Sequence, residues 1–324
     1  MPHFDLDLDD LRAYRPDVEE PHDFDEFWRE TIAQAREFEL DVALGDRVDE
    51  LRAIEAFDVS YRGWGGDPIA GWFIRPRSAE APLPAIVWFA GYGGGRGLAH
   101  EHLAWAAAGY AVFVMDTRGQ GSMWGTGGVT ADPVGSGPAF PGFTTRGIDA
   151  PDTYYYRRVF TDAVRAVDAV RHLDGVDPQR VAVAGGSQAG GIALAVGGIL
   201  DDLVGVMSEQ PFLCHFRRAV SMSPEDPYGE IARYLGIHRG SEDRVFRTLS
   251  YFDGVNFAKR ASAPGHFSVG LMDQVCPPST VFAAINHYAA DRTVEVYPYN
   301  GHEGGHFSHW PKQVAWLEGL SVSR

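Results

Sequence analysis

One serine stands where a strand-like run gives way to glycines and then to a helix-like run. Ser187 lies within residues 181–191, which read VAVAGGSQAGG. A tight turn between a buried strand and a helix lifts a serine hydroxyl off the sheet edge, and it needs small neighbours because the strand and the helix approach closely. The pattern predicts a nucleophilic serine. The alternative is an ordinary or phosphate-binding glycine-rich turn, although no lysine follows the glycines as a phosphate loop requires.

A nucleophilic serine needs a base, and the base needs an acid that orients it. When such a serine lies in a strand–turn–helix segment, the acid and then the base follow it along the chain. His302 lies in a loop after the strand-like residues 293–297, and Asp273 ends the strand-like residues 267–272. We therefore expect Asp273 and His302 to form a hydrogen-bonded relay with Ser187.

Other residues of the right types compete for these two roles. His306 and His309 fall where a final helix should begin, which makes them weaker candidates for the base. Asp253 and Glu303 are the alternative acids, but neither follows a core strand. The alternative interpretations of the preferred pair are a surface histidine at 302 and a helix-capping aspartate at 273.

The tetrahedral intermediate of acyl transfer needs hydrogen-bond donors for its oxyanion. One predicted donor is the main-chain N–H of Gln188, which directly follows the nucleophile. The other should come from a loop after an early strand, and residues 91–95, GYGGG, directly follow the apolar run 85–90. Glycines let this loop turn its N–H groups inward, so we expect the main chain of Tyr92 to be the second donor. A merely flexible turn is the alternative.

The elements that must position these residues alternate between strands and helices. Continuous apolar runs are typical of strands buried on both faces of a parallel sheet, and helical patterns lie between them, so we predict an α/β fold with a mostly parallel central sheet and helices on both faces. The predicted strands cover 54–61, 68–75, 85–90, 111–115, 181–184, 204–207, 267–272 and 293–297, with the first two as a hairpin; the predicted helices cover 24–32, 101–108, 154–173, 188–200, 279–289 and 311–317.

The chain of 324 residues is interpreted as one domain spanning 1–324. Residues 1–50 are predicted to be an N-terminal helical extension. Residues 119–152 contain many glycines and prolines and little periodicity. A loop of this length inside a compact domain is unusual and often functional, so it is interpreted as an insertion loop.

Composition narrows the partners and the location. The formal net charge of −16 disfavours binding to nucleic acid and to anionic membranes. No apolar run approaches the roughly 20 residues that span a bilayer, and the acidic start has no apolar signal core, so a cytoplasmic protein is expected. Cys214 and Cys276 are too few for a disulfide scaffold or a tetrahedral zinc site and are expected to be free, buried thiols.

Three motifs together resemble one enzyme family. They are Arg118-Gly119-Gln120, Gly185-Gly186-Ser187-Gln188 and His302-Glu303. Together they resemble the R-G-Q, G-x-S-Q-G and H-E motifs of the acetyl xylan esterase and cephalosporin-C deacetylase family, carbohydrate esterase family 7 of the α/β-hydrolase superfamily. The resemblance spans nearly the whole chain, and Ala189 departs from it where the family has glycine.

The resemblance implies Ser187, Asp273 and His302 as the triad and Tyr92 and Gln188 as oxyanion donors. It implies removal of acetyl groups from small acetylated sugars such as xylo-oligosaccharides, and from cephalosporin C, without a metal or other cofactor. It also implies hexamers whose active sites face an inner cavity, with 119–152 as an interface or rim loop. The resemblance further suggests that three neighbouring residues support the site, namely Arg118, Gln120 and Glu303.

Two other classes remain open from the sequence. The first is another hydrolase of the same fold, such as a dienelactone-type hydrolase or a peptidase. The second is a non-catalytic binding protein on this scaffold, which the complete set of serine, aspartate and histidine disfavours.

Overall fold

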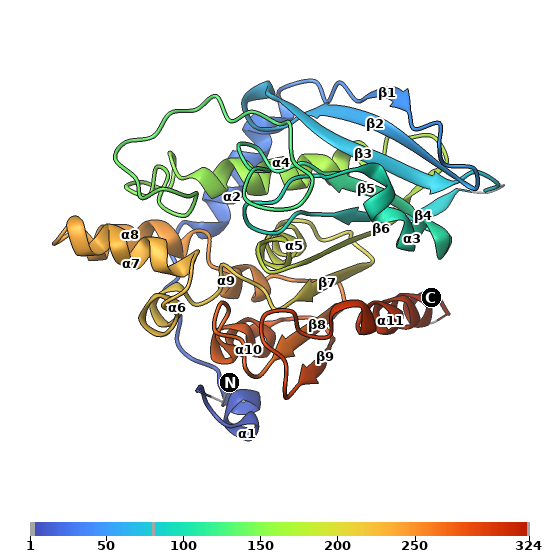
Figure 1. The fold of residues 1–324 in the computed structure, drawn as a ribbon. Helices are drawn as coiled ribbons and strands as arrows, with labels where there is room; N and C mark the ends of the chain where they lie inside the picture. Colours follow the sequence, from blue (N-terminus) through green and yellow to red (C-terminus); the bar gives the residue numbers. More distant parts are fainter. Residues whose placement is uncertain (1–3, 80–81, 323–324) are drawn as a thin grey trace.

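A single large sheet runs through the protein (Figure 1). The computed structural model describes residues 4–79 and 82–322, and within them nine strands pair in the order β1-β2-β3-β5-β4-β6-β7-β8-β9. The strands are β1 (Ala43–Arg47), β2 (Ile54–Arg62), β3 (Pro68–Pro76), β4 (Leu83–Trp88), β5 (Ala111–Met115), β6 (Val176–Gly186), β7 (Gly205–Glu209), β8 (Gly265–Gly270) and β9 (Arg292–Tyr297).

The sheet is mostly parallel, as predicted. Strands β5, β4, β6, β7, β8 and β9 pair in parallel, whereas β1, β2 and β3 add an antiparallel edge. The predicted hairpin is confirmed, because β2 and β3 pair along their whole length, from Ile54 opposite Pro76 to Arg62 opposite Pro68.

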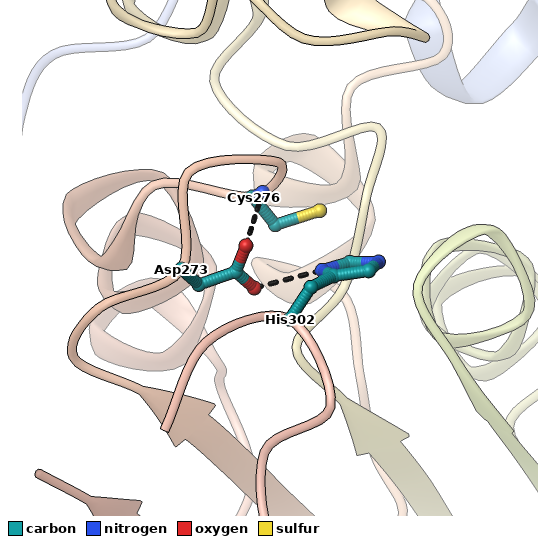
Figure 2. A group of neighbouring side chains, drawn as sticks. All are labelled: Asp273, Cys276 and His302. Carbon is teal, nitrogen blue, oxygen red and sulfur yellow. Dashed lines mark hydrogen bonds and ion pairs between the residues drawn. The ribbon is translucent and has the colours of Figure 1, made fainter. Parts of the chain in front are cut away.

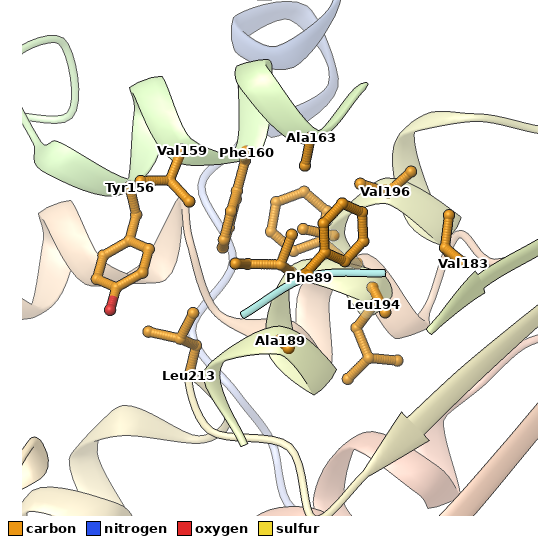
Figure 3. Close-up of a cluster of buried hydrophobic side chains, with 14 of the residues drawn as sticks. Phe89, Tyr156, Val159, Phe160, Ala163, Val183, Ala189, Leu194, Val196 and Leu213 are labelled. Atoms are coloured by element: carbon orange, nitrogen blue, oxygen red, sulfur yellow. The ribbon is translucent and has the colours of Figure 1, made fainter. Parts of the chain in front are cut away.

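One face of the sheet carries the larger core. Val181 and Val183 of β6 belong to this core, whereas the alternate residues Ala182 and Ala184 belong to the core on the other face, as the period of two in a strand requires. Figure 3 shows Phe160, on the helix Tyr155–Val170, packed over the sheet and over the adjacent helix Gln188–Ile199. The helices on this face include α2 (Phe24–Arg36), α4 (Tyr155–Val170), α5 (Gln188–Ile199), α9 (Gly254–Ala258) and α10 (Pro278–His287).

The opposite face is covered by α3 (Leu103–Ala107) and α11 (Trp310–Val322). The rings of Trp105 in α3 and Trp310 in α11 lie 5.7 Å apart, centroid to centroid. Helices therefore cover both faces, and the predicted fold class is confirmed. None of the helices in the described ranges is long and apolar enough to cross a membrane.

Besides shifts of a few residues at the ends of elements, the structure differs from the predicted elements in three places. The segment 1–50 holds the helices α1 (Leu8–Ala13) and α2, but it ends in the edge strand β1, so it is not helical throughout. All five residues of β1 are exposed, which explains why no apolar alternation marked it. The unassigned stretch after β7 forms α6 (Phe216–Met222), α7 (Tyr228–Ile237) and α8 (Glu242–Ser250), followed by α9. The predicted helix 101–108 begins as a 3₁₀ turn, Ala99–His102, before α3.

Candidate active site

Ser187 occupies a sharp turn between β6 and α5. Its backbone has φ 58° and ψ −121°, a left-handed conformation that is strained for a residue with a side chain. The turn is held because the Ser187 N–H donates to the carbonyl of Glu209 (2.9 Å) and its carbonyl accepts from the N–H of Phe212 (3.0 Å). The half-buried serine therefore presents its hydroxyl at the end of the strand.

Small residues make this turn possible. A Cβ placed on Gly185 would lie 2.2 Å from the Cβ of Ala189, and one on Gly190 would lie 2.9 Å from the carbonyl oxygen of Glu209. Ala189 itself is buried. The alanine at the position where the resembling family has glycine is accommodated because Gly185, opposite it, has no side chain.

The three residues predicted for the relay meet at one edge of the sheet. The Ser187 Oγ lies 2.9 Å from His302 Nε2, and His302 Nδ1 lies 2.8 Å from Asp273 Oδ2. With its proton on Nδ1, the imidazole donates to the carboxylate and accepts from the hydroxyl. Ser187 follows β6, Asp273 follows β8 and His302 follows β9, so parallel strands bring together residues that are 115 and 29 positions apart.

Asp273 is held rigidly by its own loop. It is fully buried, and its Oδ1 accepts hydrogen bonds from the main-chain N–H groups of Val275 and Cys276, each at 2.9 Å. Figure 2 shows the carboxylate between the Cys276 amide and the His302 ring. His302 is the more open partner, with 32% of its side chain exposed, so the imidazole can meet a ligand while the carboxylate remains out of water.

Cys276 completes a cluster that offers metal-ligand atom types. One ligand atom each from Asp273, Cys276 and His302 lies within 4.8 Å of the other two. The carboxylate and the imidazole already share a hydrogen bond, and burial raises the pKa of the Cys276 thiol well above its ordinary value. We therefore interpret this cluster as part of the relay. Both cysteines are free and buried, as predicted.

The first turn of α5 provides one predicted oxyanion donor. Gln188 is the first residue of this helix, so its main-chain N–H has no partner inside the helix. Its side chain is fully buried and exchanges two hydrogen bonds with the Gln120 amide, at 2.9 and 3.1 Å. Its Oε1 also accepts from the hydroxyl of Tyr156 (2.8 Å). These hydrogen bonds anchor the residue that directly follows Ser187.

The loop after β4 provides the other predicted donor, Tyr92. This loop is tied to the same network, because the N–H of Gly93 donates to Gln120 Oε1 at 2.7 Å. Gln120 therefore connects both predicted donors, and its Nε2 also donates to the Tyr155 hydroxyl (3.1 Å). That Gln120 supports the site stays a prediction, and these contacts are consistent with it.

A pocket of about 570 Å³ opens over the relay. Ser187 and His302 line it together with the aromatic side chains of Trp88, Tyr92 and Trp124. Its volume lies in the usual range of small-ligand pockets. The arrangement places the Ser187 hydroxyl, its histidine partner and aromatic walls around one cavity, which suits acyl transfer.

Comparison with known proteins decides the family. The sequence model of the family described as acetyl xylan esterase (AXE1) matches residues 1–320. The chain belongs to the acetyl xylan esterase family. As a member of this family, it is a carboxylic ester hydrolase.

Two acetyl xylan esterases and one acetyl esterase resemble the chain over nearly its full length. The structure of the acetyl xylan esterase from Paenibacillus sp. R4 has a TM-score of 0.91 and 40% identity, covering 97% of this chain and 99% of that one. Acetyl xylan esterase 1 from Thermoanaerobacterium sp. JW/SL YS485 has a TM-score of 0.89 and 33% identity, covering 98% and 99%. Acetyl esterase Axe7A from Xylanibacter ruminicola is 26% identical over 310 residues, covering 94% of this chain and 68% of that protein.

Two further residues that the acetyl xylan esterase motifs singled out form no hydrogen bond with Ser187, Asp273 or His302 within the described part of the chain. Arg118 is fully buried and forms an ion pair with Asp162 of α4 (2.6 Å) and another with Asp67 (3.0 Å). Burial opposes the charge, but these carboxylates outweigh it and raise the pKa of Arg118 above its ordinary value. Its carbonyl accepts the Tyr155 hydroxyl, so Arg118 anchors the loop after β5 that carries Gln120.

Glu303 is exposed and serves the loop rather than the relay. A hydrogen bond from the Asn300 side chain (2.8 Å) lowers its pKa, and the Asn300 carbonyl accepts the N–H of Met272 (3.0 Å). These contacts tie the His302 loop to the Asp273 loop. Within the described residues, Glu303 forms no hydrogen bond with Ser187 or His302.

The alternative acid and bases lie elsewhere. Asp253 caps α9 and accepts main-chain N–H groups of Val255, His215 and Phe216. His309 bonds the Tyr297 hydroxyl at 3.0 Å, and His306 begins a 3₁₀ turn. Sequence reasoning missed the tyrosines at 155 and 156; a run of tyrosines at a helix start was the only signal, and it did not reveal which glutamines they hold.

Proposed function

We propose that this chain removes acetyl groups from small acetylated xylo-oligosaccharides through an acetyl-enzyme intermediate. The observation that carries the proposal is the continuous relay from Asp273 through His302 to Ser187, whose last two members line a pocket. Membership of the acetyl xylan esterase family and the two similar structures support the same reaction.

The first half-reaction acylates the serine. His302 Nε2 takes the Ser187 proton as Oγ attacks the acetyl carbonyl, and the oxyanion accepts from the main-chain N–H groups of Gln188 and Tyr92. Asp273 holds the imidazole in the required tautomer and stabilises the imidazolium. The tetrahedral intermediate collapses, the sugar alcohol leaves with the proton from His302, and the acetyl group remains on Ser187.

The second half-reaction regenerates the enzyme. Water enters beside His302, which takes one of its protons as the oxygen attacks the acetyl carbonyl. The same two N–H groups bind the new oxyanion. When this intermediate collapses, acetic acid leaves and His302 returns its proton to Ser187, so that one ester and one water give one alcohol and one acetic acid, which ionises to acetate and a proton.

Deletion of the hydroxyl tests the proposal. The Ser187→Ala variant should fold like the wild type but release acetate from acetylated xylo-oligosaccharides at less than about one-thousandth of its rate, since removal of a nucleophile typically costs at least this factor. Acetate release and the thermal midpoint would be measured on both proteins. Wild-type-like turnover in a folded Ser187→Ala protein would overturn the proposal.

The breadth of the substrate range is tested with a panel. The proposal extends to cephalosporin C, which carries the same type of acetyl ester, and predicts faster cleavage of 4-nitrophenyl acetate than of the octanoate. Faster cleavage of the octanoate, or of peptide substrates, would favour another hydrolase of this fold over a deacetylase.

We also propose that the chain forms a homohexamer, with 119–152 as an interface or rim loop. The resemblance to carbohydrate esterase family 7 supports this, as do large apolar side chains left exposed on one copy: Val129, Ile237, Tyr299 and Phe307. A cytoplasmic location fits the two free cysteines, since reducing compartments keep thiols unpaired.

A further inference from the structure

The side chain of Tyr92 leads away from the reacting atoms to a buried carboxylate. Its hydroxyl donates to Glu230 Oε1 at 2.6 Å and accepts from the main-chain N–H of Phe143 at 2.6 Å. Glu230 belongs to α7 and is 138 residues away in the chain. The loop that carries a predicted oxyanion donor is therefore tied to two distant segments through one hydroxyl.

Glu230 has three donors but no cationic partner. Its Oε2 accepts from the Thr144 hydroxyl (2.6 Å) and from the Thr144 main-chain N–H (3.1 Å). Only 2% of the residue is exposed, and no lysine, arginine or histidine in the described part of the chain forms an ion pair with it. Burial raises the pKa of this carboxyl, although the hydrogen bonds from Thr144 and Tyr92 oppose the shift.

The surrounding chain is shaped to admit this carboxylate. Gly142 has φ 139°, and a Cβ placed on it would lie 2.2 Å from Glu230 Oε1. A buried carboxylate without a counter-charge is unfavourable, and a side chain needed only to fill this space could be apolar. What the carboxylate provides is two acceptor oxygens on opposite sides, one for Tyr92 and one for Thr144.

The remaining contacts of Tyr92 fix the adjacent peptide group. The Tyr92 carbonyl accepts from Trp124 Nε1 (2.6 Å), and the next N–H, of Gly93, donates to Gln120 Oε1 (2.7 Å). With its carbonyl, the following N–H and its phenol all held, the backbone at Tyr92 has little freedom to rotate. The phenol is the only one of these three groups that reaches α7.

We propose that Glu230 is a positioning residue for the oxyanion hole, acting through the Tyr92 hydroxyl on the direction of the Tyr92 main-chain N–H. This rests on the proposed function, in which that N–H binds the oxyanion. Donors stabilise the transition state only when they are aimed at the place where negative charge develops. Loss of the Glu230 contact therefore weakens oxyanion binding more than it weakens binding of the uncharged ester.

Two single variants and their combination test the proposal. Tyr92→Phe removes the hydroxyl and keeps the main-chain N–H, and Glu230→Gln keeps the size of the side chain but replaces one acceptor oxygen with a donor. Each should lower kcat for 4-nitrophenyl acetate about tenfold, which is less than the 10²- to 10³-fold cost of losing a donor outright, and change KM less than about twofold. The double variant should be no slower than either single variant, because both remove one coupled contact.

A transition-state analogue separates positioning from general damage. A trifluoromethyl ketone adds to Ser187 and places an oxyanion in the hole, so its inhibition constant should rise about tenfold in both variants, in step with kcat. Tyr288→Phe is the matched control. It also removes a buried hydroxyl, the one that donates to the Ala263 carbonyl at 2.8 Å, and it should lower the thermal midpoint without changing kcat or the inhibition constant.

The outcomes distinguish this proposal from the proposed function. If Ser187→Ala is inactive while Tyr92→Phe and Glu230→Gln keep wild-type kcat and analogue affinity, the positioning role is overturned and the esterase mechanism stands. Independent losses that multiply in the double variant would also overturn it. If Ser187→Ala stays active, the mechanism itself fails, whatever the two variants do.

Discussion

At the residue scale, the reactivity of Ser187 depends on a backbone conformation that the chain would not adopt alone. A side-chain-bearing residue at φ 58° carries strain of order 1–3 kcal/mol. Hydrogen bonds to Glu209, Gly191 and Phe212 hold it there. The Ser187 hydroxyl forms a hydrogen bond with His302. The His302 ring is oriented by the Asp273 carboxylate, which accepts hydrogen bonds from two main-chain N–H groups.

The orienting role of Asp273 gives a prediction at this scale. In Asp273→Asn the side-chain shape is kept, but an amide nitrogen can face Nδ1 and favour the wrong imidazole tautomer, so kcat should fall about 10³- to 10⁴-fold. Steady-state hydrolysis of 4-nitrophenyl acetate measures this effect. Asp253→Asn is the control: that aspartate is equally buried but caps α9, so it should lower stability and leave kcat near wild type. The reverse pattern would assign the acid to Asp253.

At the element scale, the parallel strands bring the candidate site residues together. The segments after β4, β6, β8 and β9 all leave the same edge of the sheet, where ligands of open α/β sheets bind. The relay could be predicted because each candidate follows a recognisable apolar strand. Since these strands are parallel, their carboxyl ends lie at the same edge of the sheet. The hairpin, the parallel core strands and the helices that begin at 24, 155 and 188 were predicted for the same reason.

The elements and contacts that were not predicted lacked a local signal. Edge strand β1 is exposed on every residue, so no periodicity distinguishes it from a loop. The pairing of Tyr92 with Glu230 links positions 138 residues apart through side chains that have no motif. Arg118 was expected beside the site, but its partners, among them Asp162 on α4, could be identified only after α4 was placed against the sheet.

The packing of α11 against β8 gives a prediction about pH. His266 of β8 and His309, just before α11, stack with ring centroids 5.0 Å apart. Burial lowers the pKa of each to about 4, against about 6.5 in an unfolded chain. Between pH 6.5 and 4 the unfolded chain therefore binds more protons, so these residues make the folded state less stable as the pH falls through this window.

Urea unfolding at pH 7.5, 6.0 and 5.0 measures this linkage. His309→Phe keeps an aromatic ring in the stack and removes one titrating group, so its free energy of unfolding should fall less steeply with acidification than that of the wild type. His100→Gln, a change at an exposed histidine, should follow the wild-type slope. Equal slopes in all three proteins would contradict the assignment of acid sensitivity to the stacked pair.

At the scale of the whole molecule, the net charge opposes the association of copies, whereas the exposed apolar side chains favour it. A net charge of −16 keeps copies apart at long range, whereas the exposed Val129, Ile237 and Phe307 favour contacts that exclude water. At 0.1 M salt, repulsion between charges more than about 10 Å apart is largely screened. Salt does not remove the apolar contacts, so association is expected at ordinary ionic strength.

Light scattering on the purified protein measures the assembly directly. The proposed hexamer predicts a mass six times that of the 35.5 kDa chain, and the same mass at higher salt. A mass of one or two chains across the concentration range would contradict the hexamer without affecting the chemistry at Ser187.

The most direct test of the central claim is to find where a fluorophosphonate probe attaches. The probe reacts with a serine that a neighbouring base has activated, and peptide mass mapping locates the adduct. The account predicts one adduct, on Ser187, in the wild type, and almost none in His302→Ala. Labelling of a different residue, or labelling of Ser187 that is equally fast without His302, would contradict it.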